Sequence, residues 1–96
     1  MTRIQKFDLD EITIPKKMKK AKPKLYKIMG MEAFYKKYKT FYGSVILSKN
    51  YELLDGYVVY YTAKKMKIKQ VPVVILNTLK DYTRFKFKKN IIEKGG

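Results

Sequence analysis

The sequence predicts one small α+β domain, with a mixed β-sheet and two main helices. Three observations support this fold class. The chain has 96 residues, which suffice for a single modest hydrophobic core. Its hydrophobic content of 46% is typical of a folded chain rather than a disordered one. Short apolar runs typical of strands are interspersed with two stretches in which apolar side chains recur at helical spacing.

The N-terminal part predicts an edge strand followed by a basic connector. Residues 7–14 (FDLDEITI) begin with alternating apolar and acidic side chains and end at Pro15, a residue type that sheets tolerate at their edges. Residues 16–24 (KKMKKAKPK) contain six lysines and are interpreted as a connector.

The first main helix is predicted over residues 24–42, where apolar side chains recur at spacings of three and four. The stripe consists of Ile28, Met31, Tyr35, Tyr38 and Tyr42. Gly43 supplies a C-terminal stop, although Gly30 interrupts the pattern. We expect this stripe to face the core rather than to stack on bases.

Three further strands follow the helix. They are predicted at residues 45–47, at residues 51–54 and, as a buried strand, at residues 71–77. The tail at residues 82–89 (YTRFKFKK) alternates only in part and predicts no definite element.

The dipeptide Asp55-Gly56 is compatible with two structures. Asp-Gly between apolar runs is a strong hairpin signal, because both residues tolerate positive φ. Alternatively, a strand ends here and a helix runs to about residue 67, with Asp55 as its N-cap. That helix would gather one apolar arc, formed by Val58, Val59, Thr62, Ala63 and Met66. The pattern alone favours the helix only slightly.

Charge is the strongest compositional signal. Twenty-three Lys and Arg stand against eight Asp and Glu, which gives a formal net charge of +15. Such an excess favours polyanionic partners, nucleic acid first and anionic membranes second. Because nearly all the cations are lysines, they would supply phosphate contacts rather than base recognition.

Several functions are excluded by composition. The chain has no Cys and no His, which removes disulfides, thiolate zinc sites, thiol nucleophiles and the usual general base. The longest apolar run, residues 71–76, is too short to span a bilayer, and the N-terminus lacks the apolar stretch of a signal peptide. We therefore expect a soluble cytoplasmic domain that does not insert into membranes.

Residues 46–76 (ILSKNYELLDGYVVYYTAKKMKIKQVPVVIL) resemble the core of the ParB/sulfiredoxin-like superfamily. Members typically show a strand, a "LxDGxxRYxAA" strand-to-helix turn and then "VPVxV". The matching residues here are Leu53, Asp55, Gly56, Tyr60, Ala63, Val71, Pro72 and Val73. The resemblance covers about residues 7–77, implies a strand–turn–helix at Asp55-Gly56, and leaves 78–96 as a basic C-terminal extension of a single domain, 1–96.

The departures from this pattern bear on function. The superfamily turn usually carries an Arg that grips a nucleotide phosphate, whereas this chain has Val59 there, preceded by Val58. Sulfiredoxins need a Cys where this chain has Tyr57, so their chemistry is excluded. We expect no nucleotide cofactor, because a valine cannot replace the Arg–phosphate contact. The degenerate phosphate turn comprises Asp55, Gly56, Tyr57, Val58, Val59 and Tyr60.

Carboxylates are sparse. Asp55 and Glu52 form a conceivable but weak metal pair, and Asp81 has no identifiable partner in the sequence. A lone Asp at a helix start is most often a cap, so we expect no metal site and no catalytic residue.

Two main functions remain, with a third at low weight. The first is a nucleic-acid-binding protein of a plasmid, phage or other mobile element, binding DNA rather than RNA. Its expected binding residues are Lys16, Lys17, Lys19, Lys20, Lys22, Lys24, Lys64, Lys65, Lys67, Lys69, Tyr57 and Tyr61. Tyrosine rings beside lysines are typical of single-strand grooves, although burial of these rings is the commoner use. The second is a protein-binding inhibitor or adaptor in which the tyrosines are interface hot spots. The third is a nucleotide hydrolase or DNase.

Overall fold

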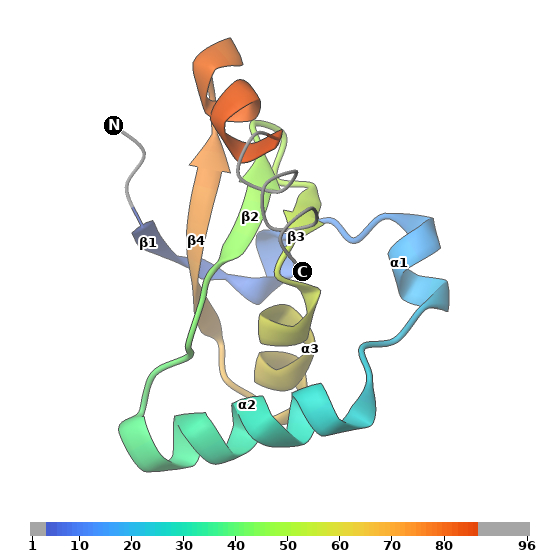
Figure 1. Ribbon diagram of the computed structural model, residues 1–96, viewed down its shortest axis with the longest axis vertical. Coiled ribbons are helices and arrows are strands. Elements are labelled where there is room, and N and C mark those ends of the chain that lie inside the picture. The colour runs from blue at the N-terminus through green and yellow to red at the C-terminus, as the bar shows by residue number, and fades with distance from the viewer. Residues whose placement is uncertain (1–3, 87–96) are drawn as a thin grey trace.

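The computed structural model describes residues 4–86 and contains a four-stranded mixed sheet in that part of the chain, with the order β1-β4-β2-β3 (Figure 1). The strands are β1 (Ile4–Asp8), β2 (Val45–Ser48), β3 (Leu53–Asp55) and β4 (Gln70–Leu76). Strands β2 and β4 are parallel, and the two outer pairs are antiparallel. The predicted α+β class with a mixed sheet is confirmed.

The helices are η1 (Leu9–Glu11, a 3₁₀ turn), α1 (Lys16–Lys20), α2 (Leu25–Tyr38) and α3 (Tyr57–Lys65), and residues 79–86 are also helical. Helix α3 lies against β2 and β4, and α2 packs against α3 (Figure 1). No helix within residues 4–86 has the length and hydrophobicity needed to cross a membrane.

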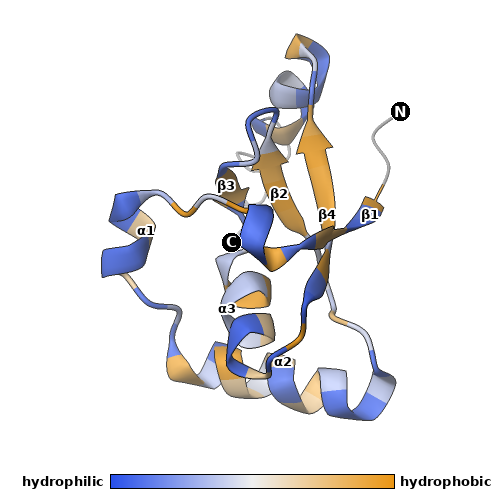
Figure 2. Ribbon diagram, turned by 180° about the vertical axis from the view of Figure 1, so that it is seen from behind, coloured by the Kyte–Doolittle hydropathy of each residue, from blue (hydrophilic) through white to orange (hydrophobic). Residues whose placement is uncertain are grey.

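The core forms between the sheet and α3. Strands β2 and β4 are strongly hydrophobic (Figure 2), as expected for central strands. The side chains with no exposed surface are Val45, Leu47, Leu53, Thr62, Ala63, Val71 and Val73. On the arc predicted for α3, Val59, Thr62 and Ala63 are buried, while Val58 and Met66 are half-buried.

Asp55-Gly56 is a strand–turn–helix and not a hairpin. Strand β3 ends at Asp55, and α3 begins at Tyr57. The predicted N-cap is wrong by one residue: Gly56 is the N-cap, and the Asp55 carboxylate accepts a hydrogen bond of 2.8 Å from the Gly56 N–H. Asp55 therefore stabilises the turn itself rather than the first helical amides.

The first strand is displaced from its prediction. It starts at Ile4 and ends at Asp8, which pairs with Gln70, the first residue of β4. Leu9 N–H still bonds to Lys69 O, at 3.0 Å. Strand β4 has no residue before Gln70 with which β1 could continue to pair, so the chain leaves the sheet after Asp8 and forms the 3₁₀ turn η1.

Helix α2 ends earlier than predicted. Lys39 adopts a left-handed conformation (φ 59°, ψ 25°), and its N–H bonds to Tyr35 O at 2.7 Å. The turn brings Phe41 into the core, with its ring centroid 4.6 Å from that of Tyr35. Tyr38 and Tyr42, predicted to face the core, are exposed instead, whereas Ile28 and Met31 are buried as predicted.

Two other regions differ in detail. The connector contains α1, and α3 ends at Lys65 because Lys67 adopts a left-handed conformation (φ 59°). In the tail, Asp81 accepts hydrogen bonds from the N–H groups of Asn77 and Thr78, while Asp81 N–H donates to Thr78 Oγ1. Asp81 therefore caps the helix at 79–86. Residues 87–89 of the predicted tail lie outside the described residues.

Thr62 carries a buried hydroxyl with no hydrogen-bond partner among the residues that the structure describes. We expect Thr62→Val to raise the free energy of unfolding by about 1 kcal/mol, because the methyl group removes an unsatisfied polar atom without changing volume. Thr83→Val is the matched control, since the Thr83 hydroxyl donates to Leu79 O at 2.9 Å on an exposed helix. Urea denaturation measures the free energy of unfolding of both variants. Equal changes in Thr62→Val and Thr83→Val, or a lower free energy of unfolding in Thr62→Val, would contradict this interpretation.

Candidate nucleic-acid interface

A pocket of about 370 Å³ lies between the segment that follows β1 and one side of α3. The first wall comes from residues 12–14 together with Lys19 and Lys22. The second wall consists of Tyr57, Tyr60, Tyr61 and Lys64, all from α3. Segments more than thirty residues apart in the sequence therefore form one concave surface.

The first wall is held in place by an extension of the sheet. Thr13 pairs with Glu52 beside β3: Thr13 N–H donates to Tyr51 O, and Leu53 N–H donates to Thr13 O, each at 2.9 Å. Ile12 next to it is buried in the core. These contacts hold residues 12–14 alongside β3. Helix α1 comes next in the chain and therefore lies near the N-terminal part of α3.

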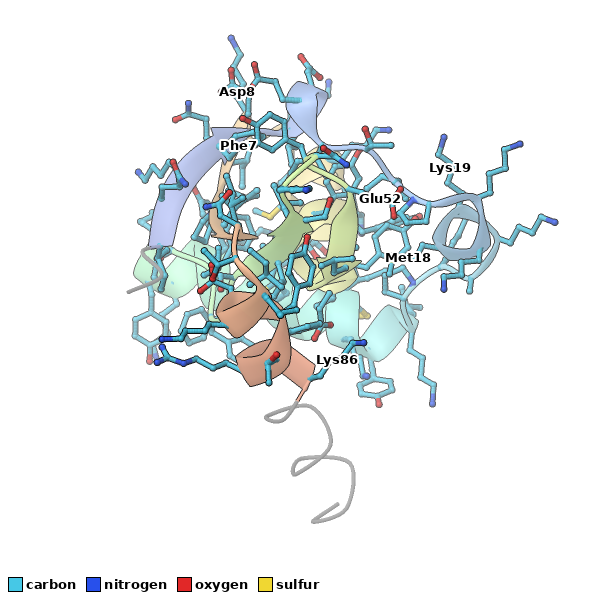
Figure 3. The ribbon with its side chains drawn as sticks, turned by 90° about the horizontal axis from the view of Figure 1, so that it is seen from above. Phe7, Asp8, Met18, Lys19, Glu52 and Lys86 are labelled. Atoms are coloured by element: carbon cyan, nitrogen blue, oxygen red, sulfur yellow. The ribbon has the colours of Figure 1, made fainter. Side chains whose placement is uncertain are left out.

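Helix α1 is attached to the body by one apolar side chain. Met18 packs against the core, while Lys19 extends from the same short helix into solvent (Figure 3). Figure 3 also shows that Glu52 lies between α1 and the sheet, near the path of the first wall. Met18 thus attaches α1 to the core, while the lysines of α1 are exposed.

The three tyrosines of the second wall form a cluster. The ring centroids of Tyr57 and Tyr60 are 6.2 Å apart in a stacked arrangement, and Tyr57 meets Tyr61 edge-on at 5.9 Å. All three residues are half-buried, which lies between the two uses considered for them, an exposed stacking surface and a buried packing role. Burial raises the pKa of the Tyr57 phenol, and neighbouring Tyr61 and Tyr60 raise it further. A phenol is neutral at physiological pH even at its ordinary pKa, and the raised pKa keeps Tyr57 further from ionisation, so that it can donate a hydrogen bond to an anion.

The structure divides the predicted lysines into separate groups. Lys19, Lys22 and Lys64 line the tyrosine pocket. Lys64 also lines an adjoining pocket of about 430 Å³ with Lys67 and Lys69. Asp8 and Asp10 line the same pocket and offset part of that charge.

The remaining predicted lysines do not line either pocket. Lys65 Nζ lies 3.2 Å from Glu32 Oε2 and joins α3 to α2, as a partly exposed ion pair of small energetic value. The exposed lysines on α1 and beside it are Lys16, Lys17, Lys20 and Lys24.

The residues of the predicted degenerate phosphate turn make contacts within the fold at Val59 and Tyr60. Val59 is 2% exposed and belongs to the core cluster. The N–H groups of Val59 and Tyr60 both donate to Gly56 O, at 3.0 and 3.3 Å. The position where the superfamily pattern has Arg is thus filled by a core side chain.

We expect negligible affinity for CTP or ATP with Mg²⁺, because Val59 offers no phosphate contact and points into the core. Isothermal calorimetry measures this directly, and low-micromolar binding would contradict it. Val59→Arg should destabilise the fold by several kcal/mol, since it would bury a charge without a partner. A folded, unperturbed Val59→Arg variant would show that this position is not part of the core.

The carboxylates that the structure describes do not form a metal cluster. Within residues 4–86, no three Asp or Glu side chains gather where an ion could bind. Asp55 bonds to the turn and Asp81 caps a helix. Their contacts give both residues a structural role.

The sequence matches no family model and no curated protein. Solved structures are similar in fold. The N-domain of a pNOB8-like ParB has a TM-score of 0.66 at 19% identity, over 90% of this chain and 34% of that chain. A second pNOB8-like ParB N-domain structure has a TM-score of 0.58 at 16% identity, over 80% of this chain and 29% of that one.

Sulfiredoxin from Arabidopsis thaliana has a TM-score of 0.69 at 15% identity, over 86% of this chain and 94% of the sulfiredoxin. This chain therefore spans about a third of the first ParB chain and nearly all of the plant protein. At these identities the likeness establishes architecture. The chain has the ParB/sulfiredoxin-like fold.

Proposed function

We propose that this chain is a small basic nucleic-acid-binding protein that uses a ParB-like fold with a degenerate nucleotide pocket. One observation carries the proposal: lysines from two distant segments, Lys19 and Lys22 on one side and Lys64 on the other, converge on a pocket lined by three tyrosines. DNA is the preferred partner, and the ParB-like fold supports an origin in a plasmid, phage or other mobile element. The domain comprises residues 1–96 and acts in the cytoplasm.

The chemistry of the pocket suits a polyanion with bases. Lysine ammonium groups neutralise phosphates as point charges without reading base edges. The tyrosine rings and the half-buried apolar side chain of Ile14 provide surface that a duplex backbone does not use, but an unpaired base does. Binding should therefore be weakly selective for sequence and strongly dependent on salt.

Fluorescence anisotropy with labelled single-stranded DNA, duplex DNA and RNA at two salt concentrations tests the proposal. We expect binding to all three, with DNA preferred, and a logarithmic association constant that falls linearly with the logarithm of salt concentration. The absence of binding at low salt would overturn the proposal and leave a protein partner as the leading explanation.

The tyrosines give a more specific expectation. Tyr57→Ala with Tyr61→Ala should weaken single-strand binding by about tenfold or more, because stacking contributes about 1–3 kcal/mol per base. Duplex binding should change much less. Tyr38→Ala with Tyr42→Ala is the control, since these rings are exposed and line neither pocket. Equal losses on single strands and duplex would show that the rings do not stack on bases.

A further inference from the structure

Helix α2 carries apolar side chains on both of its sides. Ile28 and Met31 are buried on the inner side. On the outer side, Leu25, Tyr26 and Met29 are 66%, 66% and 57% exposed. A surface helix normally has one apolar side, because an exposed apolar arc gains nothing from burial in the monomer. The outer side therefore requires a separate explanation.

The outer residues form one continuous face. At 100° per residue, positions 25, 26, 29, 30 and 33 fall on a single arc, opposite the buried side chains. Gly30 and Ala33 are also exposed, and a Cβ at Gly30 would meet nothing within 4 Å. The backbone is thus open between the larger side chains. Helix α2 forms one end of the molecule, with α3 on its inner side (Figure 1, Figure 2).

Uncompensated positive charge surrounds this face. Lys24 precedes it, and Lys36 and Lys37 follow one turn beyond Ala33 on the same arc. Glu32, the single acidic residue of α2, is engaged by Lys65 at 3.2 Å. The apolar arc is therefore bounded by lysines at both ends, with no carboxylate of α2 left to balance them.

We propose that the outer face of α2 (residues 25, 26, 29, 30 and 33) docks an acidic amphipathic helix of a partner protein. Apolar side chains of that helix cover Leu25, Tyr26 and Met29, while its carboxylates meet the lysines at either end. A second copy of this chain does not fit, because it would bring the same lysines and a net charge of +15 to the contact. A duplex offers phosphates but no apolar surface to cover the face. Leu25, Tyr26 and Met29 line neither pocket, so the partner and nucleic acid occupy different surfaces.

Two capped synthetic peptides of about 18 residues test this surface, a length that gives roughly five helical turns. One has leucines at helical spacings of three and four, with glutamate and alanine elsewhere; the other has the same composition in scrambled order. The scrambled peptide reports generic attraction to a basic protein. We expect the amphipathic peptide to bind at least about tenfold more tightly, with amide shift changes in residues 25–37.

Leu25→Gln with Met29→Gln should abolish the preference for the amphipathic peptide. Tyr38→Gln with Tyr42→Gln, which changes exposed side chains outside the arc, should preserve it. Lys36→Glu with Lys37→Glu should lower the affinity for the amphipathic peptide by about tenfold or more. Because all these side chains are exposed, circular dichroism should show unchanged folding.

Several results would overturn the proposal. These are equal binding of the two peptides, a preference that survives Leu25→Gln with Met29→Gln, and affinity that is unchanged by Lys36→Glu with Lys37→Glu. Self-association that Leu25→Gln with Met29→Gln removes would instead identify a contact between copies. Binding to phosphatidylglycerol vesicles that depends on the same two residues, without peptide binding, would identify a membrane surface.

Discussion

Gly56→Ala should lower the free energy of unfolding by about 3–5 kcal/mol, the sum of conformational strain and a steric clash. Gly56 has a φ of +83°, a region that costs L-residues energy, and a Cβ there would lie 2.5 Å from Ser44 O and 2.9 Å from Val45 Cα. Both contacts are with backbone at the start of a central strand, so neither can yield without moving β2. The midpoint temperature of thermal unfolding should fall by roughly 15 °C or more.

Two other glycines separate the causes. Gly43→Ala meets no atom within 4 Å but has a φ of +97°, so it should cost only the conformational part, about 1–2 kcal/mol. Gly30→Ala lies in α2 with open space, and should stabilise the protein by about 0.5–1 kcal/mol. If Gly56→Ala is no worse than Gly43→Ala, the close approach of the turn to β2 is not a constraint on the fold.

The triple variant Lys19→Gln, Lys22→Gln, Lys64→Gln should have the largest effect on nucleic-acid binding. If each lysine contacts one duplex phosphate, the slope of log association constant against log salt should fall by about 2.7 in magnitude. At 0.1 M salt this corresponds to a loss of roughly two to three orders of magnitude in affinity. The loss should be similar across sequences, because lysines neutralise phosphates without reading bases.

Lys36→Gln, Lys39→Gln, Lys49→Gln is the matched control, since it removes the same charge from exposed positions outside both pockets. We expect its affinity to fall by less than about tenfold, through long-range attraction alone. Equal losses in the two triple variants would mean that the protein binds through its net charge and not through the pocket.

Local sequence predicted the parts of the fold that depend on local chemistry. Residues 45–47 and 71–77 were recognisable as strands because central strands are apolar on both faces. The arc containing Val59 and Ala63 favoured a helix after Gly56, but Asp-Gly alone is equally good hairpin chemistry. The resemblance to ParB and sulfiredoxin sequences decided between them.

Other features depend on tertiary contacts. Helix α2 ends at Tyr38, and its C-cap Lys39 carries no stop signal in the sequence; the chain turns there and brings Phe41 into the core. Strand β1 ends at Asp8, which pairs with the first residue of β4. The local sequence of β1 contains no information on where β4 begins, so this boundary cannot be predicted from it. Such boundaries follow from packing rather than propensity.

The candidate site shows the same division. Composition and spacing identified the lysines and tyrosines, but not which lysines share a pocket with the rings. That grouping depends on the pairing of Thr13 with Glu52 beside β3, because this pairing places α1 and the lysines around it close to α3. Residues 12–14, which form part of the first wall, are predicted from the sequence only as the end of a strand. The sequence predicts Lys65 as a binding residue together with Lys64, whereas in the structure its ion pair with Glu32 directs it to α2.

The most direct test of the nucleic-acid interface is amide chemical-shift mapping of the ¹⁵N-labelled protein with a short single-stranded oligonucleotide at low salt. We expect the largest changes in residues 12–14, 19–22 and 57–64, which form the two walls of the tyrosine pocket. Changes confined to other surfaces, such as residues 25–37 of α2, or the absence of any change, would contradict the proposed interface.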